Sequence, residues 1–120
     1  MKVKNILIIG GSGFLGSSVV DEFIKKKIKI TVLDKKKLHL KNPYVNFIQS
    51  DISDEKELQN QIRKNKLIYY FADIADINEG KKNPFSTIDH NIINLTKILK
   101  ACGKFKINNF IYGSSLYVYS

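Results

Sequence analysis

The sequence predicts an α/β fold in which helices cover both faces of a doubly wound parallel sheet. Short apolar runs typical of buried strands alternate with segments of helical periodicity, and each connection is long enough for a crossover between parallel strands. A glycine-rich turn, GGSGFLG at residues 10–16, separates the first strand pattern from the first helix pattern. With 120 residues, of which 43% are hydrophobic, the chain is long enough for one domain with a buried core, spanning residues 1–120.

The first part of the chain predicts two strands around one helix. Residues 3–10, VKNILIIG, are a short continuous apolar run, as in a strand that is buried on both faces. From Phe14 onward, apolar residues recur at helical spacing as far as a run of three lysines. Residues 27–34, KIKITVLD, alternate as a second strand that ends at Asp34, and the polar residues 35–43 follow as a loop or short helix.

Two further strands enclose a short helix. Residues 45–51, VNFIQSD, are interpreted as a third strand, and residues 67–73, LIYYFAD, are an apolar run whose aromatic residues favour a strand. Between them, Asp54 and Glu57 form a variant of the capping box just before a helical pattern. They predict a helix over residues 55–64.

A long helix is predicted over residues 84–103, because Pro84 suits the first helical turn and Gly103 is a natural C-terminal stop. Its apolar residues recur every three or four positions, and we expect this stripe to be buried: Phe85, Ile88, Ile92, Leu95, Leu99 and Cys102. Residues 107–115, INNFIYGSS, then read as a fifth strand that runs into a loop. The resulting architecture has three α/β/α layers and about five parallel strands.

The amino-acid composition indicates which class of partner the protein has and in which cellular compartment it works. The formal net charge is +9, but lysine supplies nearly all of it and Arg63 is the only arginine, the residue that reads phosphates and bases in a bidentate way. We interpret the lysines as solvated surface and predict no nucleic-acid partner, with a functional basic surface as the alternative. The single cysteine, Cys102, excludes an internal disulfide, and the apolar run at residues 6–9 is too short for a signal peptide or membrane span. We expect a cytoplasmic protein without a membrane segment.

Gly10, Gly13 and Gly16 stand at every third position between the first strand and the first helix. In a doubly wound sheet this turn brings a dinucleotide pyrophosphate close to the backbone, where free N–H groups and the helix dipole stabilise its charge. Gly10 would make the turn, Gly13 would admit the phosphate and Gly16 would let the helix pack on the strand. Asp34 ends the second strand, where a carboxylate accepts the ribose hydroxyls of NAD. The alternative is a tight turn without a ligand.

These residues resemble the N-terminal part of the extended short-chain dehydrogenases/reductases, the NAD-dependent epimerase/dehydratase family, which has a Rossmann-like fold. The glycines match its G-x-x-G-x-x-G pattern, SDISD matches its acidic-Ile pair, YFADIAD its H-x-A-A segment, and NFIYGSSLYVYS its S-S-x-x-V-Y-G strand and loop. The resemblance implies NAD rather than NADP as cofactor. The cofactor-binding residues that it implies, together with the glycine turn, are Gly10, Ser12, Gly13, Phe14, Leu15, Gly16, Asp34, Lys35, Asp51, Ile52, Phe71, Ala72 and Asn91.

Several positions depart from the family pattern. Tyr70 stands where the family has histidine, and Asp73 where it has a small residue. Two neighbouring residues of the long helix also have alternative interpretations. Asn91 either contacts the cofactor region or is a structural hydrogen-bond donor between loops, and His90 is interpreted as an exposed helical residue.

Catalysis in the resembled family requires a Tyr-x-x-x-Lys pair, in which the lysine lowers the tyrosine pKa for proton transfer during hydride transfer. No tyrosine of this sequence is followed by lysine four positions later. Ser115 matches the serine that hydrogen-bonds the reacting oxygen, and Tyr119 matches a structural tyrosine rather than the base. We therefore expect an NAD-binding portion of a longer enzyme, inactive by itself and with its sheet incomplete at the C-terminal end.

For the whole protein the resemblance implies a nucleotide-sugar substrate and a homodimer formed through the helix over residues 84–102. The alternative is a non-catalytic Rossmann module that binds nucleotides, regulates another protein or associates with RNA. A Tyr-x-x-x-Lys pair beyond Ser120 would decide for the enzyme.

Overall fold

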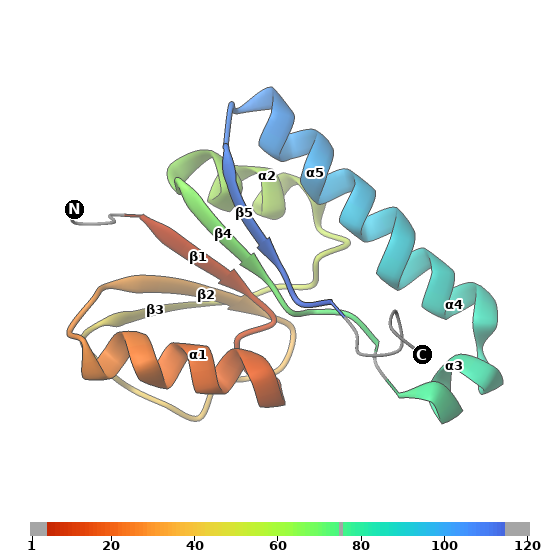
Figure 1. The fold of residues 1–120 in the computed structure, drawn as a ribbon, viewed down its shortest axis with the longest axis horizontal. Coiled ribbons are helices and arrows are strands. Elements are labelled where there is room, and N and C mark those ends of the chain that lie inside the picture. The colour runs from red at the N-terminus through yellow and green to blue at the C-terminus, as the bar shows by residue number, and fades with distance from the viewer. Residues whose placement is uncertain (1–4, 75, 115–120) are drawn as a thin grey trace.

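A computed structural model describes residues 5–74 and 76–114 of the chain. Its helices and strands alternate along most of the sequence (Figure 1). They are β1 (Ile6–Ile9), α1 (Phe14–Lys25), β2 (Ile30–Asp34), β3 (Val45–Gln49), α2 (Glu55–Lys64), β4 (Leu67–Tyr70), α3 (Ile77–Lys82), α4 (Pro84–Ile88), a π-helical segment η1 (Asp89–Ile93), α5 (Asn94–Lys104) and β5 (Asn109–Tyr112).

The five strands form one parallel sheet in the order β3-β2-β1-β4-β5. The chain builds outward from β1 to β3, then returns to the other side of β1 with β4 and β5 (Figure 1). In the centre of the sheet, Ile8 pairs with Val32 of β2 and with Tyr69 of β4. The prediction of a doubly wound α/β fold is confirmed.

Alternate residues of β1 enter two separate cores, one on each face of the sheet. Ile6 and Ile8 pack in the core that α1 closes through Val20. Leu7 and Ile9 pack in the opposite core with residues of α2 and α5, among them Leu58, Ile62, Ile98, Ala101 and Cys102. All four residues of β1 are buried, which explains why its sequence is a continuous apolar run rather than an alternating one.

The predicted start and end of α2 are confirmed. Asp54 is its N-cap, and the Asp54 side chain accepts a hydrogen bond of 3.1 Å from the backbone N–H of Glu57. This bond satisfies one of the helix donors that would otherwise lack a partner in the first turn.

The long helix predicted over residues 84–103 is not one continuous α-helix. The structure divides it into α4, the π-helical turn η1 and α5, which continues through Gly103 to Lys104 and is capped by Phe105. A short helix before it, α3, was not predicted from the sequence. Its N-cap is Asp76, whose side chain accepts a hydrogen bond of 2.8 Å from the backbone N–H of Asn78.

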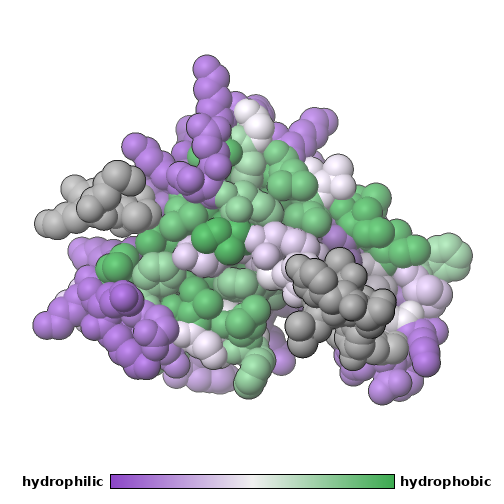
Figure 2. Space-filling model, viewed as in Figure 1, coloured by the Kyte–Doolittle hydropathy of each residue, from purple (hydrophilic) through white to green (hydrophobic). Residues whose placement is uncertain are grey.

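The predicted buried stripe of this helix is wrong for most of its residues. Cys102 is buried and Leu95 is partly buried, but the others are exposed: Phe85 (86%), Ile88 (51%), Ile92 (56%) and Leu99 (48%). The buried face of α5 instead contains Ile98 and Ala101. A π turn adds one residue to the helical repeat and so rotates the residues around it. Figure 2 shows apolar residues along the exposed side of α4 and α5. Because the buried and the exposed face of this helix are both apolar, the sequence pattern could not distinguish them.

The predicted fifth strand is shorter in the structure, and Ser115 lies outside the described residues. Among the helices that the structure describes, none is long and apolar enough to cross a lipid bilayer.

Candidate functional site

A cleft of about 150 Å³ opens at the carboxyl ends of the central strands. Its walls come from the segments that follow β1, β2, β3 and β4, together with one side chain of η1. In open parallel sheets, ligands bind at this edge, where the strand order reverses. The lining residues are Gly10, Gly13, Leu33, Asp34, Lys35, Lys36, Ser50, Asp51, Ile52, Phe71, Ala72, Asp73 and His90.

Two of the three spaced glycines are required by the packing of the protein itself. Gly10 has a φ of 84°, and a Cβ at this position would lie 2.7 Å from the backbone nitrogen of Ala72. A Cβ at Gly16 would lie 2.1 Å from the carbonyl oxygen of Gly10. Neither position accepts a side chain without moving the backbone, so these glycines bring α1 and the segment after β4 against the turn.

Gly13 differs from the other two glycines. Its φ of −78° suits any residue, and the nearest atom to a Cβ there is the carbonyl oxygen of Gly10 at 3.5 Å, an ordinary contact distance. The packing of the protein therefore does not require glycine at this position. Gly13 lines the cleft, so the absence of a side chain keeps this part of the cleft open.

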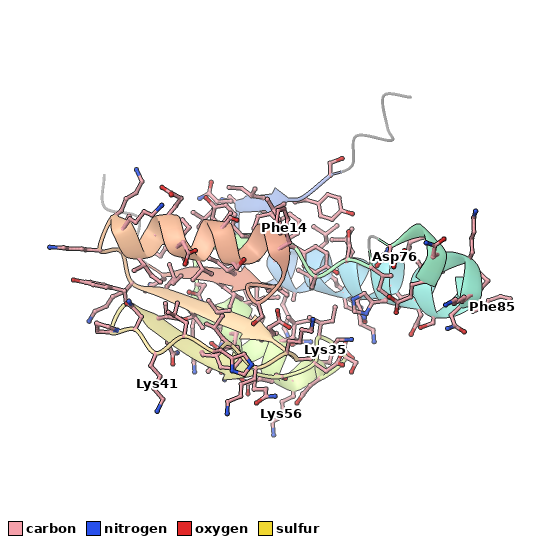
Figure 3. All side chains as sticks on the ribbon, turned by 90° about the horizontal axis from the view of Figure 1, so that it is seen from below. Phe14, Lys35, Lys41, Lys56, Asp76 and Phe85 are labelled. Carbon is pink, nitrogen blue, oxygen red and sulfur yellow. The ribbon has the colours of Figure 1, made fainter. Side chains whose placement is uncertain are left out.

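The N-terminus of α1 lies beside this opening. Its N-cap, Gly13, has no side chain to accept the free N–H groups of the first turn, which contains no acidic residue. The positive end of the helix dipole is therefore not neutralised from within the helix. Figure 3 labels Phe14, the first residue of α1, and Lys35, which follows β2, at the same end of the sheet.

Asp34 holds the glycine turn against the end of β2. Its Oδ2 accepts a hydrogen bond of 2.9 Å from the backbone N–H of Ser12, and its Oδ1 accepts one of 2.9 Å from the N–H of Lys36. The Ser12 hydroxyl adds a bond of 3.1 Å to the carbonyl oxygen of Lys36. Each carboxylate oxygen can accept a second hydrogen bond, so Asp34 retains acceptor capacity toward the cleft that it lines.

Asp51 and Ile52 form the wall after β3. Asp51 Oδ1 accepts a hydrogen bond of 2.9 Å from the backbone N–H of Ser53, and this bond lowers the pKa of the Asp51 carboxyl, with a smaller contribution from the positive charge of Lys35. Ile52 is buried in the core beneath the cleft. This wall therefore combines an ionised carboxylate with an apolar surface.

The π-helical segment η1 supports the wall after β4. His90 Nε2 lies within hydrogen-bonding distance of the carbonyl oxygen of Ala72. The Asn91 carboxamide bonds twice to the backbone of Ile74, accepting from its N–H at 2.7 Å and donating to its carbonyl oxygen at 2.9 Å. Asn91 is not among the lining residues, so its observed contacts match the structural alternative, whereas His90 reaches the cleft.

A cluster of two tyrosines surrounds Asp73 beyond Ala72. The Tyr112 hydroxyl donates a hydrogen bond to Asp73 Oδ2, which raises the pKa of Tyr112 to about 12. The buried Tyr70 ring stacks on Tyr112 with 5.9 Å between centroids. Burial, followed by the negative charge of Asp73, raises the pKa of Tyr70. Both tyrosines are therefore neutral at physiological pH.

The structure brings together most of the cofactor residues predicted from the sequence. Eight of them line the cleft: Gly10, Gly13, Asp34, Lys35, Asp51, Ile52, Phe71 and Ala72. Five do not, although all lie in or beside elements that form it: Ser12, Phe14, Leu15, Gly16 and Asn91. The side chain of Phe14 is 94% exposed.

Sequence reasoning missed five lining residues: Leu33, Lys36, Ser50, Asp73 and His90. All five are direct neighbours in sequence of predicted residues. Leu33 lies near the end of β2, and Lys36, Ser50 and Asp73 follow β2, β3 and β4, so these strand ends could have indicated four of them. His90 is placed by the π turn, for which the sequence gives no clear signal.

The comparison with protein families decides the classification of the chain. Residues 6–120 match the model of the NAD dependent epimerase/dehydratase family, which is nearly the whole chain. The chain belongs to this family. The match includes the glycine turn, Asp34 and every other residue that lines the cleft.

Relatives in the NAD dependent epimerase/dehydratase family are moderately similar in sequence. Bifunctional protein GAL10 of Candida maltosa is 28% identical over 94% of this chain and 82% of that protein. A putative UDP-glucose 4-epimerase of Methanocaldococcus jannaschii is 31% identical over 92% of this chain but only 37% of that protein. Among solved structures, UDP-N-acetylglucosamine 4-epimerase from Methanobrevibacter ruminantium M1, in complex with UDP-N-acetylmuramic acid, has a TM-score of 0.88 at 29% identity, over 100% of this chain and 40% of that one.

Proposed function

We propose that this chain binds NAD across the cleft and is the cofactor-binding portion of a nucleotide-sugar epimerase or dehydratase. The observation that carries the proposal is the glycine at position 13. Its backbone angles and surroundings would accept a side chain, yet the position lines the cleft at an uncapped helix N-terminus. A phosphate group that approaches this backbone closely accounts for both features.

The remaining lining residues fit the parts of a dinucleotide. The first turn of α1 would hold the pyrophosphate, and Asp34 would accept the hydroxyls of the adenosine ribose through its remaining lone pairs. Asp51 and Ile52 would border the adenine with one polar and one apolar surface. Phe71 and Ala72 would lie along the other nucleotide, with Asn91 acting indirectly because it anchors Ile74.

When bound, NAD would supply a hydride acceptor for oxidation of a sugar hydroxyl. The residues of this chain would bind and orient it and keep the pyrophosphate charge stabilised. No tyrosine of the chain has a lysine four positions later, so we propose that these 120 residues bind the cofactor without turning over a substrate. Ser115 remains the proposed hydrogen-bond donor to the reacting oxygen.

The substrate of the whole protein would be a nucleotide sugar, a class to which the named relatives point. We also propose that the protein is cytoplasmic and forms a homodimer through residues 84–102. The support is the exposed apolar side of α4, η1 and α5, formed by Phe85, Ile88, Ile92, Ile93 and Leu99. Patches of this kind on an otherwise lysine-rich surface are typical of protein interfaces.

Calorimetric titration of the chain with NAD tests the proposed function. Wild-type protein should bind NAD, and Gly13→Val should abolish binding because a branched side chain would occupy the space for the phosphate. Gly13→Val should keep the circular dichroism spectrum of the parent, since the protein itself leaves room at Cβ. Wild-type protein that does not bind NAD, or Gly13→Val that binds within a few-fold of wild type, would refute the proposal.

A further inference from the structure

Asp73 places a third carboxylate in the cleft besides Asp34 and Asp51, and it lies on the opposite side of the glycine turn from Asp34. Asp34 ends β2 and Asp73 follows β4, while the turn follows β1, which lies between these strands in the sheet. Asp34, Gly10, Gly13 and Asp73 all line the cleft. A carboxylate therefore stands on each side of the proposed pyrophosphate position.

The Asp73 carboxylate is held in place without a neutralising cation. Oδ2 accepts the Tyr112 hydroxyl, and Oδ1 is buried without a hydrogen-bond partner among residues 5–74 and 76–114. Within the same residues the structure gives one ion pair, Lys25 with Glu22 on α1. The hydroxyl of Tyr112 has its pKa raised to about 12 and stays protonated, so it positions the carboxylate and leaves its charge unchanged. Asp73 thus places a carboxylate, held by Tyr112, on the β4 side of the cleft.

A dinucleotide with its adenosine ribose at Asp34 extends past the glycine turn to the β4 side, because these ligands bind across the point where the strand order reverses. The nicotinamide ring on that side carries a positive charge when oxidised and none when reduced, whereas the rest of the cofactor has the same charge in both states. A fixed carboxylate there interacts differently with the two states.

We propose that Asp73 makes this site bind the oxidised form of the cofactor more tightly than the reduced form. The proposal rests on the proposed NAD site and adds a preference that the glycine turn and Asp34 do not supply, since these contact parts of the cofactor that do not change. For opposite charges in a partly hydrated cleft, the difference corresponds to about a tenfold ratio of dissociation constants. A protein with this preference rests in the state that can accept a hydride.

The test measures dissociation constants for NAD⁺ and NADH at neutral pH, by calorimetry and by NADH fluorescence, on the wild-type chain and three variants. Wild type should bind NAD⁺ about tenfold more tightly than NADH. Asp73→Asn removes the charge and keeps an acceptor for Tyr112, so it should lose most of this ratio. Tyr112→Phe keeps the charge and should retain the ratio within about threefold. Asp34→Asn, the matched change on the other side of the turn, should weaken both forms equally.

Several outcomes would overturn the proposal. They are a wild type that binds NADH as tightly as NAD⁺, an Asp73→Asn protein with an unchanged ratio, or one in which both forms weaken together, as a purely structural role predicts. If Asp73→Asn fails to fold, the wild-type ratio of the dissociation constants for NADH and NAD⁺ decides the question alone. Wild type that binds neither form refutes the proposed NAD site itself, whereas binding of both without preference refutes only the role of Asp73.

Discussion

Two adjacent residues of α5 test which face of this helix is buried. Ile98 is fully buried in the core that α2 and α5 form with the sheet, whereas the side chain of Leu99 is 48% exposed. The periodicity of the sequence predicted the opposite, with Leu99 in the buried stripe. Truncating each residue to alanine therefore separates the two arrangements, because both changes remove an aliphatic side chain of the same size.

The expected destabilisation follows from burial. Ile98→Ala loses the transfer free energy of the removed carbons and leaves a cavity, for a total of about 3 kcal/mol within the usual range of 2–5 kcal/mol. Leu99 is about half buried, so Leu99→Ala forfeits roughly half of the 1.5–3 kcal/mol that full burial contributes, or about 1 kcal/mol, and water fills the space. A difference of about 2 kcal/mol is large against the 5–15 kcal/mol by which most domains are stable.

Urea denaturation at low protein concentration, followed by circular dichroism, gives both free energies of unfolding. Low concentration matters because Leu99 belongs to the exposed apolar side that we propose as an interface. Ile98→Val, expected to cost about 1 kcal/mol, provides a second measurement if Ile98→Ala leaves too little folded protein. Equal losses for Ile98→Ala and Leu99→Ala, or a larger loss for Leu99→Ala, would show that the assigned buried face of α5 is wrong.

Three further measurements test the cofactor preference, the tyrosine cluster and the exposed helix face. Calorimetry should show tighter binding of NAD than of NADP, because the Asp34 carboxylate repels a 2′-phosphate; tighter NADP binding would mean that Lys35 and Lys36 face the ribose instead. In an absorbance titration of tyrosine ionisation, Tyr112→Phe should remove a transition near pH 12. The pKa of Tyr112 is about 12 in the folded protein and about 10 in the unfolded chain. The contribution of Tyr112 to stability is therefore present below about pH 10 and lost as pH rises through about 12. If the transition lost in Tyr112→Phe lies near pH 10 instead, the hydrogen bond from Tyr112 to Asp73 is contradicted. The side chain of Ile92 is 56% exposed, so Ile92→Glu should reduce self-association, measured by light scattering, and lower the melting temperature by no more than a few degrees. Unchanged self-association would place the interface elsewhere.

Local patterns in the sequence were sufficient for the strands and for α1 and α2, and together with the family resemblance they indicated most of the cleft. A buried parallel strand needs a continuous apolar run, and β1 has one, so its position could be predicted without its neighbours. The carboxyl ends of parallel strands meet at one edge, which is why Gly10 and Asp34 could be assigned to one site although they are far apart in the chain. Asp51 and Ala72, which line the same cleft, were assigned through the resemblance to the family. The cap at Asp54 is likewise a contact between near neighbours.

Tertiary structure decided the features that depend on contacts between distant residues. The chain is apolar on two sides of the segment 84–104, and the π turn together with packing against the sheet selects Ile98 rather than Leu99 as the buried residue. The same turn allows Asn91 to hold Ile74 and His90 to reach Ala72. Asp73 acquires its position from Tyr112, a partner on another strand. The periodicity of a sequence shows which faces of a helix or strand are apolar, but the neighbouring elements determine which of those faces is covered. For that reason these contacts could not be predicted from the sequence alone.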